Sequence, residues 1–217
     1  MAQKSSPYAI RVGYNQVWNN YFFPFNKKEQ IDLLQKSKLI RDYLYKILPD
    51  IAQLKIDYNR SNIFIYLYIP EINLVLGEKQ ENLTKIVKEI NSLINDSKIK
   101  LRFNLIEVKK VYSCAQTVAN LVASQIKNRL PFRLVLRNTL NKLTPEKEVK
   151  GAKIQVSGRL DGAEIARTES VNYGKMPLST IDSNIDIGRQ EVTTIYGKIG
   201  IKVLIYKGKL WQKKIKR

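Results

Sequence analysis

Two arginines, Arg133 and Arg137, stand four positions apart just after Pro131, and they are the residues best suited to chemistry in this sequence. Residues at this spacing share one face of a helix, so the two guanidinium groups point the same way. A guanidinium donates paired hydrogen bonds to a phosphate, so the pair predicts binding of a polyanionic backbone. An ordinary amphipathic helix start, with both arginines in water, is the alternative that the local pattern leaves open.

The charge of the whole chain favours the polyanion. Its 38 Lys+Arg outnumber its 19 Asp+Glu and give a net charge of +19 over 217 residues. Between residues 98 and 142 there are ten basic residues and one acid, Glu107. Self-repulsion at this charge opposes a compact chain, and the usual resolution is a nucleic acid partner or, less often, an anionic membrane surface. A merely soluble basic protein is the remaining alternative.

The side chains that enzymes use are scarce. Histidine is absent, and Cys114 is the single cysteine, so neither a histidine base nor a thiolate cluster for zinc is available. A nuclease-like magnesium site is conceivable, but the spacing of its carboxylates is not diagnostic and ion pairs explain them better. We therefore expect no enzyme activity, no catalytic residue, no metal site and no cofactor. The carboxylates in question are Asp161, Glu164, Asp182, Asp186 and Glu191.

Hydrophobic periodicity outlines the elements of the first half. It predicts helices over residues 27–48 and 81–94, with a β-hairpin between them that turns at residues 59–62. Residues 98–105 alternate as a strand, whose polar face carries three positive charges and no negative one. A solvated sheet surface and contact with a polyanion both fit that face. Its residues are Lys98, Lys100, Arg102 and Asn104.

The second half predicts two helices followed by a sheet. Helices are expected over residues 115–129 and from residue 131, the second with Phe132 opening its apolar stripe. Strands are expected over 152–158, 163–171, 190–197 and 199–208, with Gly158 and Gly162 allowing a tight connection. No apolar run approaches the roughly 20 residues of a membrane span. The fold class is therefore α+β, with a domain boundary near residues 108–115.

Several motifs resemble the family of small-subunit ribosomal protein number three. "VSGRLDGAEIARTE" (156–169), "MPLSTIDSNIDIG" (176–188) and "TTIYGKIGIKVLIYKG" (193–208) are similar to its C-terminal domain. "MAQKSSPYAIRVG" (1–13) and "VWNN" (17–20) match its N-terminal pattern, and residues 27–108 match mainly by periodicity. The resemblance covers essentially the whole chain in order.

The resemblance implies two domains. An N-terminal arm (1–26) precedes a type II KH domain (27–110), in which helices pack on a three-stranded sheet, and an α/β domain (111–208) follows, with two helices packed on a mixed or antiparallel four-stranded sheet. The run of positive charge over residues 209–217 predicts a basic tail, either solvated or bound to phosphates.

The resemblance also implies partners and a place. The partners would be small-subunit ribosomal RNA, mRNA and neighbouring proteins of the small-subunit head, with no membrane. The chain would line the channel through which mRNA enters the ribosome. The residue bias favours an organellar matrix, mitochondrion before plastid, with the bacterial cytoplasm as the other possibility. A KH-type RNA-binding module acting off the ribosome is the alternative function.

Charge and position together with this family's motifs indicate the site residues. Its channel helix carries Phe-Arg-Arg-x-x-Lys; here Phe132 and Arg133 match, Leu134 replaces the second arginine, and Arg137 stands at the lysine. The predicted RNA-binding residues are Lys4, Arg11, Lys127, Arg129, Arg133, Arg137, Arg159, Arg167 and Lys198. For Arg159 and Arg167, pairing with Asp161, Glu164 or Glu169 is an equal alternative. Beside the arm, Trp18 is expected to pack in a core.

The KH phosphate clamp looks degenerate. A KH domain holds single-stranded backbone with a Gly-x-x-Gly loop. Here Gly77 occupies the first position, Gln80 stands at the second glycine, and Glu78 places a negative charge in between. Gly77 and Lys79 remain the only candidates, so we expect the loop to bind RNA weakly.

Overall fold

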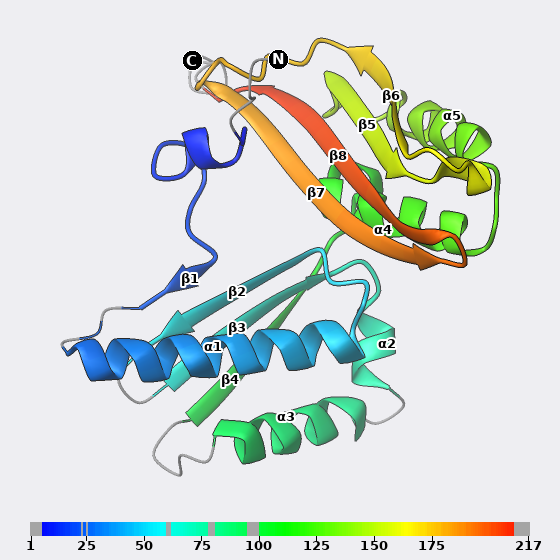
Figure 1. The fold of residues 1–217 in the computed structure, drawn as a ribbon. Coiled ribbons are helices and arrows are strands. Elements are labelled where there is room, and N and C mark those ends of the chain that lie inside the picture. Colours follow the sequence, from blue (N-terminus) through cyan, green and yellow to red (C-terminus); the bar gives the residue numbers. More distant parts are fainter. Residues whose placement is uncertain are drawn as a thin grey trace. The chain divides into compact units, whose positions relative to one another are not determined.

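The chain forms two units, each with its own sheet and core. A computed structural model describes residues 6–22, 24, 26–59, 62–77, 81–94 and 100–210. One unit comprises Trp18–Lys109, and the other joins Met1–Val17 to Lys110–Arg217. Each has a four-stranded sheet (Figure 1). The predicted α+β class with two domains is confirmed, but the structure divides the predicted arm between the two units.

The N-terminal unit has a mixed sheet in the order β1-β2-β3-β4. β2 (Gln53–Tyr58) and β3 (Asn62–Ile69) form the predicted antiparallel hairpin, and β4 (Lys100–Glu107) runs parallel to β3. The resemblance implied three strands. A fourth, β1 (Asn20–Tyr21), pairs in parallel with β2, because the N–H of Ile56 donates to the carbonyl of Asn19 at 3.0 Å.

Both long helices of this unit pack on one face of the sheet. α1 (Lys27–Ile47) and α3 (Glu81–Ile94) confirm the two predicted helices, and the short α2 (Ile72–Leu76) was not predicted. Alternation along β2 and β3 directs every second side chain into the core, and each buried aliphatic side chain contributes about 1.5–3 kcal/mol. The core joins Leu54, Ile56, Ile63, Ile65 and Leu67 of the sheet to Ile40 and Leu44 of α1 and to Ile86, Ile90 and Ile94 of α3.

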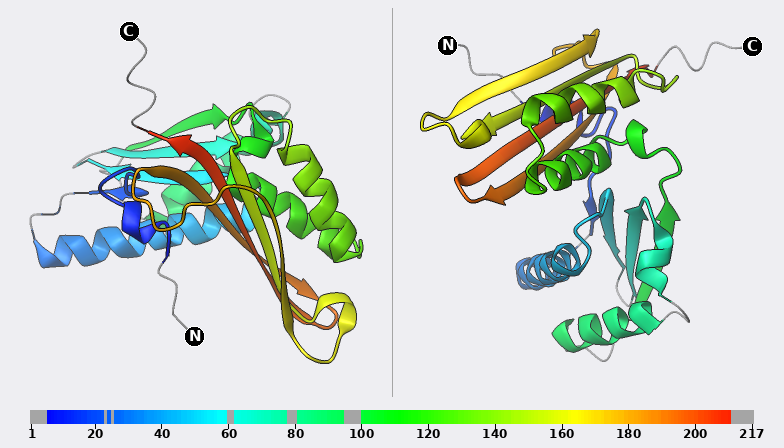
Figure 2. Two further views of the ribbon diagram at one scale, coloured as in Figure 1. Left: turned by 90° about the horizontal axis from the view of Figure 1, so that it is seen from above. Right: turned by 90° about the vertical axis from the view of Figure 1, so that its right-hand side faces the viewer.

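The C-terminal unit has an antiparallel sheet in the order β6-β5-β8-β7. The strands are β5 (Gly151–Gly158), β6 (Arg167–Gly174), β7 (Ser183–Thr194) and β8 (Gly197–Lys209). α4 (Ala115–Lys127) packs on β7 and β8, and α5 (Phe132–Leu143) packs on β5 and β6, as Figure 2 shows. Two helices on a four-stranded sheet were predicted, and this is confirmed.

The start of α4 is fastened to β7 at close range. A Cβ added to Gly188 would lie 2.1 Å from the carbonyl oxygen of Ala115, so only glycine permits this approach. The Asp186 carboxylate accepts the N–H of Ala115 at 2.9 Å and caps the helix. These contacts set where α4 begins on the sheet.

Three short 3-10 turns connect the elements. η1 (Ala9–Arg11) lies in the N-terminal segment, η2 (Val111–Ser113) precedes α4, and η3 (Leu160–Gly162) follows β5. The third strand of the prediction was placed at residues 163–171, but β6 begins at Arg167. The difference arises because η3 and the residues after it form the connection from β5.

Candidate nucleic-acid interface

Arg11 was predicted to bind RNA from the N-terminal arm, and the structure corrects this. The side chain is fully buried in the C-terminal unit, and burial lowers the pKa of its guanidinium. All three guanidinium nitrogens donate to protein carbonyls and the side chain is closed to solvent, so no phosphate can reach it, and Arg11 instead holds residues 7–11 against residues 177–183. It donates at 2.6–3.3 Å to the carbonyl oxygens of Pro7, Pro177, Leu178, Thr180 and Ser183.

Trp18 also differs from its prediction. We expected it in a core, but its side chain is 64% exposed. Lys4, the other predicted contact of the arm, lies outside the described residues, so its role stays a prediction.

Gly77 has a structural role at the end of α2. Its φ of 66° lies in the left-handed region, and its N–H donates to the carbonyl of Asn73 at 3.0 Å. Glycine takes up this conformation without the steric cost of a Cβ. Lys79 lies outside the described residues, so RNA binding by Gly77 and Lys79 stays a prediction.

Five predicted cations lie at one end of the C-terminal unit, in its loops or at the adjoining ends of helices and a strand. Four segments meet there: the end of α4, the turn into α5, the β5–β6 connection and the β7–β8 hairpin, seen at the right of Figure 1. They enclose a pocket of about 360 Å³ whose lining includes Phe132 and Tyr196. We name this surface the loop-end surface; its cations are Lys127, Arg129, Arg133, Arg159 and Arg167.

Arg129 sits in a strained turn. The N–H of Leu130 donates to the carbonyl of Gln125 at 3.2 Å, and the N–H of Arg129 donates to that of Ile126 at 3.0 Å. These bonds form a Schellman motif, which usually places glycine where Arg129 has a φ of 61°. The turn therefore holds an exposed arginine at a position that sterically favours glycine.

Arg159 is fixed by the two loops beside it. Its Nε donates to the carbonyl of Ala163 at 2.9 Å, and its guanidinium lies 5.9 Å from the ring centroid of Tyr196. A Cβ on Gly162, whose φ is 80°, would lie 3.1 Å from that ring, so the glycine admits the tyrosine. The alternative of pairing with Asp161 is not what holds Arg159.

Arg133 and Arg167 flank one aromatic ring. Their guanidinium carbons lie 5.7 Å and 5.8 Å from the centroid of Phe132, which is buried. The Glu169 carboxylate lies 3.5 Å from Arg167 and 3.8 Å from Arg133. For Arg167 the predicted pairing with Glu169 is thus present, but both guanidinium groups remain largely open to solvent, with side chains 73% and 48% exposed for Arg133 and Arg167.

Arg137 extends the cationic surface by one helical turn. It is exposed on α5, as is Arg133, so the pair shares a solvent-facing side of the helix. Leu134, which replaces a family arginine, is 50% exposed between them. Lys198 at the start of β8 is exposed and lies 3.5 Å from Glu191, and it does not line the pocket.

Two of the carboxylates considered for a magnesium site, Asp186 and Glu191, make other interactions. Asp186 caps α4 and lies 3.4 Å from Lys207, and Glu191 pairs with Lys198. Among the described residues, no group of three acids, histidines and cysteines is placed to hold a metal ion. In the same part of the chain, no helix is both long enough and apolar enough to cross a bilayer.

A polar cluster stabilises the beginning of the C-terminal unit. Glu148 accepts hydrogen bonds from Lys110 at 2.6 Å and from Ser113 at 3.0 Å. These bonds lower the pKa of Glu148, and the bond to Glu148 raises the pKa of Lys110. Lys110 is therefore engaged by the protein.

Sequence reasoning missed Phe132 and Tyr196 as platforms for the arginines. Both rings lie under guanidinium groups, yet Phe132 was interpreted as the first residue of an apolar stripe and as a match to the family motif, and Tyr196 was given no role. The sequence did hold a signal for the ion pair beside the Phe132 ring: Arg167 and Glu169 stand two apart on a strand and therefore share a face. The ring contacts depend on loop geometry, which carries no such period.

Fold and site together define an α+β protein that presents clustered arginines and lysines on loops and a helix. The family model described as "Ribosomal protein S3, C-terminal domain" matches residues 122–205. The small ribosomal subunit protein uS3 of Spiroplasma citri is 36% identical over 217 residues, covering 99% of this chain and 85% of the relative. Those of Mycoplasma capricolum and Leptospira biflexa are 37% and 36% identical, each covering at least 96% of the chain and 91% of the relative.

The chain belongs to the ribosomal protein uS3 family. This confirms the resemblance seen in the motifs. The family consists of structural ribosomal proteins, and the chain is accordingly not an enzyme.

Proposed function

We propose that this protein is built into the head of the small ribosomal subunit, binds small-subunit ribosomal RNA and neighbouring head proteins, and lines the channel through which mRNA enters. The observation that carries the proposal is the loop-end surface together with Arg137, where cations from the end of α4, the turn after it and the β5–β6 connection lie on the same unit as the exposed arginine pair of α5. Arg133 and Arg137 engage the phosphates of incoming mRNA, and the remaining cations bind ribosomal RNA.

The rings under the arginines support this role. A guanidinium held over an aromatic ring keeps its charge and loses some freedom before binding, so less entropy is lost when it meets a phosphate.

The central test removes the pair. Ribosomes carrying Arg133→Ala with Arg137→Ala should translate messages with structure downstream of the start site less well, and unstructured messages normally. The matched control is Lys27→Ala with Lys28→Ala, which removes the same charge from exposed positions on α1. Equal translation of both kinds of message by the arginine variant would refute the mRNA assignment.

A gain-of-function variant sharpens the test. Leu134 lies exposed between the arginines, where the family pattern has a second arginine. Leu134→Arg should improve translation of structured messages without changing the fold. An unchanged or poorer rate would show that this face of α5 does not meet the message.

Assembly has its own test. The chain should sediment with the small subunit at moderate salt and dissociate as salt rises, because each phosphate contact releases counterions. The alternative, a KH module acting off the ribosome, predicts sedimentation apart from ribosomal particles.

The organisms of the relatives bear on the compartment in which this protein works. Residue bias favoured an organelle, mitochondrion before plastid, but the relatives reported above are bacterial and lend this no support. They favour the other possibility, the ribosome of a bacterial cytoplasm.

A further inference from the structure

The helix-free face of the N-terminal sheet carries a row of aromatic side chains. Alternation along β3 buries Ile63, Ile65 and Leu67 under the helices, so the residues between them point to the opposite face. Those residues are Phe64, Tyr66 and Tyr68, all partly exposed. Successive side chains on one face of a strand lie about 6–7 Å apart, which follows from the rise per residue.

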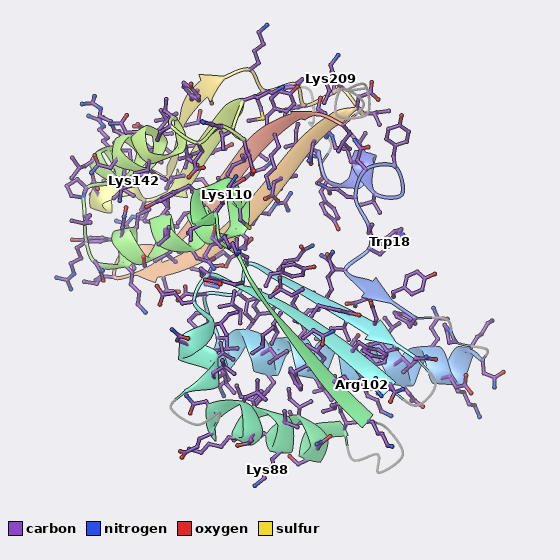
Figure 3. All side chains as sticks on the ribbon, turned by 180° about the vertical axis from the view of Figure 1, so that it is seen from behind. Trp18, Lys88, Arg102, Lys110, Lys142 and Lys209 are labelled. Atoms are coloured by element: carbon purple, nitrogen blue, oxygen red, sulfur yellow. The ribbon has the colours of Figure 1, made fainter. Side chains whose placement is uncertain are left out.

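Cations from the neighbouring strands flank this row. Arg102 of β4 pairs with Phe64 in the register, and its guanidinium lies 5.5 Å from the ring centroid. Lys55 of β2 pairs with Tyr66, and its ammonium lies 5.4 Å from the centroid of Tyr68. Figure 3 shows Arg102 on β4, seen from the side on which the strands lie in front of α1.

The edges of the face are mainly polar. Asn104 pairs with Tyr66, and Lys100, exposed, pairs with Asn62. Asp57, opposite Phe64, is the acid on this face among the described strand residues. We name the rings with these flanking side chains the sheet platform.

We propose that the sheet platform binds single-stranded RNA by stacking unpaired bases on Phe64, Tyr66 and Tyr68, while Lys55, Lys100 and Arg102 contact the backbone. Every base has a π-face, so such stacking tolerates different sequences. Sheet aromatics that stack two or three bases are an established way for a domain to hold single-stranded RNA. This site lies on different elements from the loop beginning at Gly77 and from the loop-end surface.

Charge argues for RNA over a protein on this face. Three cations and one acid surround the rings, and the Arg102 guanidinium and the Lys55 ammonium already lie beside ring faces. A typical protein-docking surface is depleted of charge at its centre. An RNA strand supplies both the bases for the rings and the phosphates for the cations.

The experiment uses the full chain carrying Arg133→Ala with Arg137→Ala, so that binding through α5 is reduced and the result does not depend on the mRNA assignment. The probe is a fluorescent short oligouridine, and affinity is measured over a range of salt. Phe64→Leu with Tyr66→Leu removes two rings while keeping apolar bulk. The matched control is Tyr45→Leu, the same kind of change on the exposed side of α1.

The ring variant should bind at least about fivefold more weakly for each stacked base that is lost, with an unchanged salt slope. Arg102→Gln should instead lower the slope of log affinity against log salt concentration by about 0.7, because one phosphate contact is lost. The control is Lys88→Gln on α3, which removes a charge outside the sheet platform and should not lower the slope through loss of a platform contact. Ultraviolet cross-linking of 4-thiouridine RNA to the chain with all its sheet-platform residues should label residues 62–69, which tests the proposal even if a variant unfolds.

Binding by the ring variant equal to that of the Tyr45→Leu control, without cross-links in 62–69, would overturn the proposal. A platform that cross-links to a ribosomal protein in assembled subunits, and not to RNA, would replace it with a protein-docking face. Normal translation by the arginine double variant would count against the proposed function alone.

Discussion

Arg11 and Arg133 lie in the same unit, and the structure uses them in opposite ways. Arg11 is fully buried and donates to five backbone carbonyls. Arg133 is held from one side by Phe132 and Glu169 and keeps most of its surface in water. Both were predicted to bind RNA on the basis of charge and resemblance.

The contrast shows that a positive charge indicates a phosphate contact only when its donors remain open. Five carbonyls give Arg11 the partners that water would otherwise supply, so its burial is compensated without any RNA. A ring and one carboxylate orient Arg133 without using up its donors. The surplus of cations therefore divides into a structural part and a binding part, and each prediction below tests one side of that division.

The largest effect is expected at Arg11. Arg11→Ala leaves several buried carbonyls without donors and should lower the free energy of unfolding by at least about 3 kcal/mol, since charged hydrogen bonds contribute about 1.5–3 kcal/mol each. Arg11→Lys should rescue little, because an ammonium lacks the planar fork. Urea denaturation followed by circular dichroism measures both variants. A stable Arg11→Ala protein with weakened RNA binding would reverse the assignment.

A smaller effect is expected at Arg129, where structure and binding oppose each other. Arg129→Gly removes the Cβ from a residue with a φ of 61° and should stabilise the C-terminal unit by about 1 kcal/mol. Arg129→Ala is the matched control, because it removes the same charge and keeps the strain. Both variants should bind RNA equally weakly, while only the glycine variant melts later. Unchanged RNA binding in both would remove Arg129 from the binding side of the comparison.

The fold shows which features could be predicted from the sequence and which could not. Periodicity predicted the helices at 27–48 and 81–94, the hairpin and the order of the C-terminal elements, because burial on a regular element repeats along the chain; the first helix is observed at Lys27–Ile47. It did not predict β1 or the fate of Arg11 and Trp18. Those depend on which distant carbonyls or surfaces an irregular segment meets, and an irregular segment has no period to reveal its partners.

The candidate site shows the same limit. The shared face of Arg133 and Arg137 followed from their spacing, and exposure on α5 agrees with it. The gathering of Lys127, Arg129 and Arg159 around one pocket followed from no local pattern, since the end of α4 and the distant β5–β6 connection bring them together. RNA binding by these side chains remains a prediction.

A change at Glu169 tests how far its carboxylate limits the RNA affinity of the neighbouring arginines. Glu169→Gln removes the carboxylate that lies near Arg133 and Arg167, so both guanidinium groups become more available to phosphate. Exposed pairs contribute about 0.2–1 kcal/mol, so RNA affinity should rise roughly two- to threefold while stability changes little. The control is Glu81→Gln at the exposed start of α3. Fluorescence anisotropy with a short RNA decides it, and a lower affinity would show that Glu169 positions the arginines productively.

The smallest effect is expected at Glu148, an acid on the structural side. Its bonds to Lys110 and Ser113 lower its folded pKa below the ordinary value of 4.5, so they stabilise the fold above that value. This stability is lost as pH falls through the lowered folded pKa, where the carboxylate takes up a proton. Lys110 gives the opposite sign at the alkaline end: its pKa is raised above 10.5, and its contribution disappears as pH rises through the raised value.

Glu148→Gln should therefore lose stability relative to the unaltered chain at neutral pH and converge with it in acid, with RNA affinity unchanged. Urea midpoints measured from acid to neutral pH test this, with Glu81→Gln as the control. A Glu148→Gln protein that binds RNA more tightly would show that Lys110 belongs to the binding cations, because the substitution weakens the ion pair that engages Lys110 in the unaltered chain.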